Sequence, residues 1–207
     1  MTAETELTDL AAGIAREAGE LALWRREEGV HLAATKSSLA DIVTEADREV
    51  EALVRARLRE ARPGDGFLGE ESDADAGVTG ITWVVDPIDG TVNYAYGIPA
   101  YAVSIAAVRG EAVPGRWEAL AAAVFAPAHD ELFTAARGEG AWRGSVRLAV
   151  TSATPAGALW DFAAGALLVA EAGGVVTRVD TASARPMLIA AGPDVHARLT
   201  VLLDEEA

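Results

Sequence analysis

The chain has 207 residues, of which 51% are hydrophobic and 24% are charged. This balance allows a sizeable core and argues against a disordered, collagen-like or disulfide-rich chain. Basic residues number 17 and acidic residues 32, so the net charge is −15, and a field of that sign repels nucleic acid and anionic membranes. There is no cysteine, which excludes disulfides, thiolate metal sites and cysteine nucleophiles.

Hydrophobic spacing predicts two helices at the start of the chain. Apolar residues at steps of three and four from residue 7 to residue 24 indicate an amphipathic helix that ends near Gly29. A second helix is expected from Thr44, which can cap it, with Asp47 in a capping-box position. The acidic first ten residues hold no apolar run, and no stretch approaches roughly 18 apolar residues. We therefore expect a cytoplasmic protein without a signal peptide or membrane span.

Short apolar runs then predict strands at residues 67–68, 81–85, 101–108 and 119–125, and a hairpin at 131–136 and 141–143. A third helix is expected over 162–172, with Asp161 as its N-cap, followed by strands at 175–179 and 187–190 and a last helix over 193–203. These elements predict a layered mixed α/β protein. We divide it into an N-terminal α+β part, residues 1–150, and a short C-terminal α/β part, residues 151–207.

Residues 83–91, WVVDPIDGT, carry the strongest functional signal. A buried strand is expected to end there in two carboxylates, Asp86 and Asp89, with a proline between them. The backbone N–H groups of Gly90 and Thr91 follow. Two carboxylates, the carbonyl of Ile88 and adjacent amide donors suit a hard cation together with a phosphate. An ordinary acidic turn would give the same letters.

Three further acidic segments matter because they accompany the first. Glu70 and Glu71 follow another expected strand, Asp41 and Asp47 flank the start of the second helix, and Asp161 opens the third. Each has a plain structural alternative, since paired glutamates occur in solvated turns and aspartates cap helices.

Taken together, these segments resemble the inositol monophosphatase family of magnesium-dependent, lithium-sensitive sugar-phosphate phosphatases. The matching blocks are residues 36–47, 69–72, 83–93 and 160–174, and residues 101–105 and 131–140 resemble the family's intervening strands and hairpin. The resemblance implies a layered α-β-α-β-α sandwich of the inositol monophosphatase and fructose-1,6-bisphosphatase type, with a shortened second half.

The resemblance also implies two to three Mg²⁺ ions. Glu70, Asp86 and the carbonyl of Ile88 would hold the first, while Asp86, Asp89 and Asp161 would hold the second. A third, weaker ion near Glu70 would carry the attacking water.

The remaining roles follow from the same resemblance. Thr91 and Asp47 would orient and activate the water, and the amides of Gly90 and Thr91 would bind the phosphate beside Asp89 and Asp161.

Lys36 and Asp41 would lie next to the site. Lys36 is the only lysine in the chain, which indicates a local requirement, although a solvated loop lysine fits the sequence equally well.

The sequence departs from the family before Trp160. Relatives place helices, strands and a substrate-binding acidic residue ahead of this position, whereas here the nine residues 151–159 lead straight into it. Either the protein itself is truncated here, or the sequence omits a segment that the protein has. The abrupt junction favours an omitted segment. A true deletion would expose a sheet edge and predict low stability or reliance on a homodimer.

The first hypothesis is a Mg²⁺-dependent phosphatase that hydrolyses a small polyol phosphate, with myo-inositol 1-phosphate as first candidate, without a covalent intermediate. Histidinol phosphate, fructose 1,6-bisphosphate and 3'-phosphoadenosine 5'-phosphate are alternatives within the superfamily. A second hypothesis is a metal- or phosphate-binding relic without turnover. A third hypothesis is a structural or interaction protein, in which the acidic segments serve only as helix caps and turns.

Overall fold

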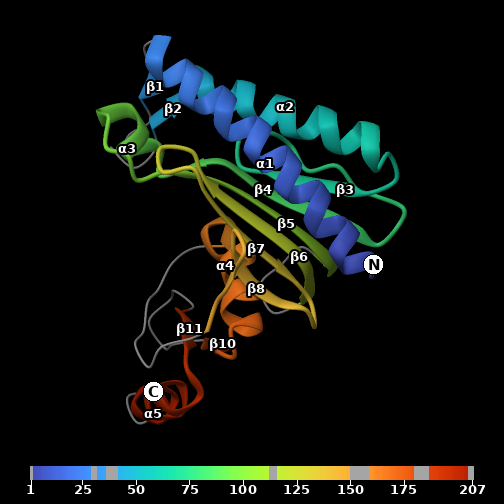
Figure 1. Ribbon diagram of the computed structural model, residues 1–207, viewed down its shortest axis with the longest axis vertical. Coiled ribbons are helices and arrows are strands. Elements are labelled where there is room, and N and C mark those ends of the chain that lie inside the picture. Colours follow the sequence, from blue (N-terminus) through green and yellow to red (C-terminus); the bar gives the residue numbers. More distant parts are fainter. Residues whose placement is uncertain are drawn as a thin grey trace.

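Helices cover both faces of a central sheet in this computed structural model (Figure 1). α1 (Ala3–Glu28) and α2 (Glu45–Ala61) pack side by side on one face, and α4 (Leu159–Glu171) packs on the other. The structure describes residues 2–28, 32–35, 42–111, 116–149, 159–179 and 187–204.

A second, smaller sheet lies beyond α4. It consists of β10 (Val175–Val179) and β11 (Met187–Ala191), which pair antiparallel, and α5 (Pro193–Asp204) contacts β11. Because α4 contacts both sheets, the order of layers is α-β-α-β-α. The layered mixed α/β fold that the sequence predicts is therefore confirmed.

The central sheet has seven strands in the order of the sequence, and only its first pair is parallel. In that pair, β3 and β4 point their carboxyl ends toward the same edge of the sheet. A separate antiparallel pair, β1 with β2, precedes α2, and the short helix α3 follows β4. These strands and this helix are β1 (Leu32–Thr35), β2 (Ile42–Thr44), β3 (Gly66–Gly69), β4 (Ile81–Asp89), α3 (Thr91–Tyr96), β5 (Ala102–Gly110), β6 (Trp117–Ala126), β7 (Glu131–Ala136), β8 (Gly140–Arg143) and β9 (Val146–Arg147).

Small side chains let α1 lie close to the sheet. A Cβ atom added at Gly19 would stand 2.4 Å from a ring carbon of Phe125, so the helix backbone lies almost directly on that ring. The alanines of the same helix face are fully buried at positions 11, 15, 18 and 22. The other face of the sheet buries Val84 against α4, where Leu167 is 5% exposed. The core is thus split into two layers by the sheet, as strand alternation requires.

Two details of the sequence prediction were wrong. β4 continues through Asp89 and does not end at Val85, because a bulge lets the strand pass through the Asp-Pro-Ile-Asp segment. Asp161 is not the N-cap of α4, since the helix begins at Leu159 and places Asp161 in its first turn. The β1–β2 pair was not predicted at all.

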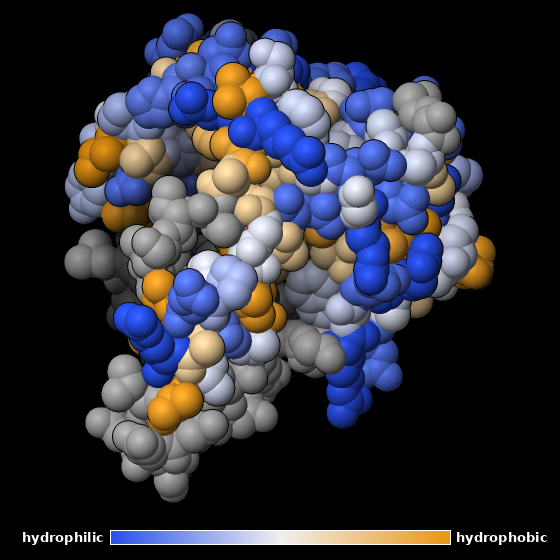
Figure 2. All heavy atoms as spheres, turned by 60° about the horizontal axis from the view of Figure 1, so that its bottom comes forward, coloured by the Kyte–Doolittle hydropathy of each residue, from blue (hydrophilic) through white to orange (hydrophobic). Residues whose placement is uncertain are grey.

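No helix in the described ranges combines the length and the apolar character needed to cross a bilayer. Figure 2 shows hydrophilic residues gathered over the upper part of one face of the molecule, interrupted by smaller hydrophobic areas. Large exposed apolar side chains among the described residues belong to different elements, for example Trp24 of α1, Val146 of β9 and Val201 of α5.

Candidate active site

The carboxyl ends of β3 and β4 bring two of the predicted site residues together. In the parallel pairing Gly69, the last residue of β3, lies opposite Val85. Glu70 and Asp86 are the residues that come directly after this pair along the chain. Asp86 is only 3% exposed, and Glu70 is exposed at the surface. A buried carboxylate next to an accessible one is an arrangement that a divalent cation stabilises, because it neutralises charge that burial would otherwise penalise.

A bulge in β4 shapes the segment between the two aspartates. Asp86 pairs with Ser104 and Asp89 pairs with Ala102, so three steps along β4 match two along β5. The extra residue re-aims the strand locally, as bulges beside active sites commonly do. The hydroxyl of Thr91 donates a hydrogen bond of 3.0 Å to the carbonyl of Ile88. A carbonyl oxygen has two lone pairs, so this atom keeps one for a further partner.

The turn from β4 into α3 depends on Gly90. Its φ of 93° lies in the left-handed region, which L-residues with a Cβ avoid. A Cβ atom there would also stand 2.8 Å from the carbonyl oxygen of Ala100. The same oxygen accepts a hydrogen bond of 2.8 Å from Nδ2 of Asn93. The loop 97–101 is therefore drawn against the start of α3.

Tyr94 anchors α3 to the rest of the molecule. Its side chain is fully buried, and its hydroxyl donates a hydrogen bond of 2.7 Å to the carbonyl of Ala22 in α1. Its ring meets Tyr101 edge to face, with centroids 4.9 Å apart. Burial raises the pKa of the Tyr94 hydroxyl well above its ordinary range, and the nearby charges of Tyr101 and Asp47 raise it further. The phenol therefore stays neutral and keeps its proton for the carbonyl of Ala22, which ties α3 to α1.

Asp47 lies in the first turn of α2 and is 2% exposed. The amino end of a helix favours a negative charge, so this buried carboxylate is held where the helix itself stabilises it. Figure 1 shows the start of α2, the end of β4 and α3 at the same end of the molecule. The structure therefore brings Asp47, Glu70, Asp86, Asp89 and Thr91 to one end of the sheet.

The structure leaves part of the predicted set untested. Among the side chains that it describes, no group of three or more acidic or histidine residues lies close enough to hold a metal ion. Lys36 and Asp41 fall outside the described residues, and for Asp161 only the helical backbone is described. The metal ligands therefore stay a prediction, which rests on donors that are all oxygen atoms, as Mg²⁺ prefers.

Glu51 is a residue of this region that the sequence analysis did not single out. It lies one helical turn after Asp47, is 3% exposed, and accepts hydrogen bonds from the residues that follow Glu70. The spacing of four residues places Asp47 and Glu51 on the same face of α2, but the partners of Glu51 lie 20 and 21 residues further along the chain, where no local pattern points to them.

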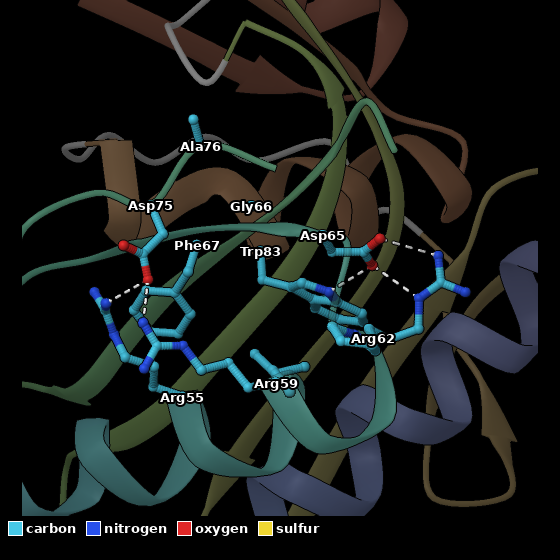
Figure 3. A pocket seen from close by; sticks show the side chains of 11 residues that line it. Arg55, Arg59, Arg62, Asp65, Gly66, Phe67, Asp75, Ala76 and Trp83 are labelled. Carbon is cyan, nitrogen blue, oxygen red and sulfur yellow. Dashed lines mark hydrogen bonds and ion pairs between the residues drawn. The ribbon is translucent and has the colours of Figure 1, made fainter. Parts of the chain in front are cut away.

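A cavity of about 220 Å³ lies at the other end of α2 (Figure 3). Arg55 and Arg59 both bind Asp75 there, and Arg62 binds Asp65. Arg59 is twelve residues along the helix from Asp47, or about 18 Å at 1.5 Å per residue. Because its cations are already paired and it stands far from the carboxylate end, this cavity is not the candidate active site.

Comparison with known proteins shows the family to which this chain belongs. A model of the inositol monophosphatase family matches residues 3–159. The chain belongs to that family. The match ends immediately before Trp160, where the sequence analysis places the departure from the family pattern.

Individual relatives agree with this assignment. An inositol-1-monophosphatase of Rhizobium meliloti is 47% identical over 112 residues, which are 54% of this chain and 40% of that protein. An inositol monophosphatase 1 of Sus scrofa is 34% identical over 151 residues, which are 70% of this chain and 52% of that protein. The chain spans about half, or less, of the length of these curated relatives.

The similarity of fold extends further along the chain. The crystal structure of the extragenic suppressor protein suhB from Bartonella henselae aligns with a TM-score of 0.79 and 27% identity, and covers 94% of this chain and 97% of that one. An alignment that covers 94% of this chain must extend past residue 159, where the family match ends. The C-terminal layers β10, β11 and α5 therefore belong to the same fold.

Proposed function

We propose that the protein is a Mg²⁺-dependent phosphatase that hydrolyses a small polyol or sugar phosphate monoester. The observation that supports this proposal most is the parallel register of β3 and β4, in which Gly69 lies opposite Val85, so that Glu70 and Asp86 come next at the end of the sheet that leads to Thr91 and α3. The family assignment supports it, since the matched relatives are inositol-1-monophosphatases.

The donor set fits magnesium. Glu70, Asp86 and the carbonyl of Ile88 would hold one ion, and Asp86, Asp89 and Asp161 a second, with a third, weaker ion near Glu70. When bound, Mg²⁺ would neutralise the phosphate dianion and lower the pKa of a bound water. A protein of charge −15 needs such cations to admit a dianionic substrate.

The chain's own groups would supply positioning and proton transfer. The hydroxyl of Thr91 donates to Ile88, so its lone pairs can accept a hydrogen bond from a water molecule and orient it. The buried carboxylate of Asp47 would hold the proton that this water loses. Backbone N–H groups of Gly90 and Thr91 would donate to the phosphate, and a direct attack by water would need no covalent intermediate.

The first candidate substrate is myo-inositol 1-phosphate. It is favoured by the relatives' names and by residues 89–94, which resemble inositol-type members of the family. Histidinol phosphate, fructose 1,6-bisphosphate and 3'-phosphoadenosine 5'-phosphate are the competing substrates. We also propose that the chain forms a homodimer, which light scattering on the purified protein would test.

The experiment is phosphate release from each of these four esters with Mg²⁺ and with a chelator in its place, on protein of confirmed intact mass. Magnesium-dependent release that is fastest from myo-inositol 1-phosphate is the expected result. Mg²⁺ binding by calorimetry without release from any ester would instead support a metal-binding relic. A mass well above 21.5 kDa would show that the sequence lacks a segment of the protein.

A further inference from the structure

The buried carboxylate of Glu51 binds the turn that follows β3. It is one of the few charged side chains in the core of the described residues, at 3% exposure. Its Oε2 atom accepts a hydrogen bond of 2.7 Å from the backbone N–H of Glu71, and its Oε1 atom accepts one from the hydroxyl of Ser72. A buried charge is tolerated only when such donors satisfy it.

The carboxylate of Glu51 fits here because residue 69 is a glycine and has no side chain. A Cβ atom at Gly69 would stand 2.3 Å from Oε2 and 2.5 Å from Cδ of Glu51. No side chain fits between them. Glu70 is therefore flanked by two residues that the same carboxylate engages, Gly69 by close packing and Glu71 by a hydrogen bond.

One turn further along α2, Arg55 binds the rest of the same loop, and Figure 3 shows its contact with Asp75. Its Nη2 atom donates to the hydroxyl of Ser72 and to the carbonyl of Asp73, each at 2.6 Å, and its Nη1 atom donates to Asp75 at 2.7 Å. Its guanidinium also lies over the ring of Phe67, 4.3 Å from the centroid. Glu51 and Arg55 thus tie residues 69–75 to two successive turns of α2.

We infer that Glu51 is a positioning residue, which fixes the backbone on both sides of Glu70 and so holds that carboxylate where it binds magnesium. The inference rests on the proposed function for the role of Glu70. Sites of this kind tolerate displacements of only about 0.5 Å, and a turn released from α2 would move further. Glu51 itself touches neither the metal nor the substrate in this scheme.

The chemistry of the contact distinguishes three substitutions. Glu51→Ala removes both acceptors. Glu51→Gln keeps one oxygen for the Glu71 N–H, and its amide can donate to the Ser72 hydroxyl, which accepts as well as donates. Glu60→Ala, at the exposed end of the same helix with a side chain 78% exposed, is the matched control.

The test measures two properties of the full-length chain that do not depend on turnover. Amide hydrogen exchange of residues 70–72 is followed without metal, and the Kd for Mg²⁺ is measured by calorimetry. Glu51→Ala is expected to speed exchange at these amides and to raise the Kd, each at least 10-fold. Glu51→Gln and Glu60→Ala should stay within about 3-fold of the parent in both.

A Mg²⁺ Kd in Glu51→Ala within twofold of the parent would overturn the inference, whatever its activity. If Glu51→Ala does not fold, the Mg²⁺ Kd of Ser72→Ala tests the inference instead. Ser72 is exposed, and its substitution removes one of the two hydrogen bonds that the Glu51 carboxylate accepts. A threefold or greater rise in its Kd supports the inference, and an unchanged Kd refutes it. Phosphate release is scored separately, so a parent that binds Mg²⁺ but hydrolyses no ester defeats the proposed function alone.

Discussion

The hydroxyl of Thr91 donates its proton to the backbone carbonyl of Ile88 across a bulge, with 3.0 Å between the two oxygen atoms. This bond joins the first residue of α3 to the last buried residue of β4. It also fixes the direction in which the hydroxyl's lone pairs face. A group predicted to bind metal and a group predicted to orient water are thereby locked into one geometry.

Thr91→Val should lower kcat by about 100-fold or more, because a group that positions a proton transfer commonly contributes that much. Valine keeps the shape and the branching and loses only the hydroxyl. Thr91→Ser keeps the hydroxyl and should stay within about tenfold of the parent. Steady-state kinetics at saturating Mg²⁺ provides both values, and equal kcat in the valine and serine variants would refute the role of the hydroxyl.

Gly90→Ala should destabilise the protein by more than the strain of its backbone conformation alone. A Cβ atom at positive φ costs about 1–2 kcal/mol, and at Gly90 it would also meet the carbonyl oxygen of Ala100 at 2.8 Å. Gly80 is the matched control, because its φ is 79° and nothing lies within 4 Å of an added Cβ. Urea denaturation should show a larger loss of unfolding free energy for Gly90→Ala than for Gly80→Ala. Equal losses would mean that the loop moves away without cost.

Asp65 should make stability depend on acid pH. Burial would raise the pKa of its carboxyl, yet hydrogen bonds from Arg62, Thr79 and Trp83 hold that pKa below its ordinary value of 3.8. The folded state therefore binds fewer protons than the unfolded state below about pH 4, so this stability is present at neutral pH and is lost as pH falls through the folded pKa.

Asp65→Asn should accordingly lower the free energy of unfolding at pH 7 by about 1.5–3 kcal/mol, the range for hydrogen bonds to a charged group. The difference from the parent should shrink as the pH falls below 3.8. Urea midpoints followed by tryptophan fluorescence at pH 7, 5, 4 and 3 would show this, with Asp73→Asn as control. A difference that stays constant down to pH 3 would contradict the assignment.

Most of the fold could be predicted because its elements carry strong local patterns. The three-and-four spacing of α1 and the apolar runs of β5 and β6 need no tertiary information. β4 was cut short because the residues after Val85 resemble a turn, and only pairing with Ser104 and Ala102 of β5 shows that the strand continues through a bulge.

The site was predicted in outline, and the family resemblance supplied its roles. Glu51 was missed because its partners, Glu71 and Ser72, are 20 and 21 residues further along the chain. A single glutamate in a helix with many charged residues carries no sign of burial. Such contacts come from packing α2 against the end of β3, and no local pattern of the sequence encodes that packing.

The most direct test of the central claim is phosphate release from myo-inositol 1-phosphate by Asp86→Asn, at saturating Mg²⁺ and on protein of confirmed mass. Asp86 is the residue predicted to contact two metal ions. Asp130→Asn is the control, since the side chain of Asp130 is 82% exposed and forms a surface ion pair with Arg16. The account predicts that Asp86→Asn abolishes Mg²⁺-dependent release while Asp130→Asn keeps the parent rate. Release by Asp86→Asn at the parent rate would contradict it.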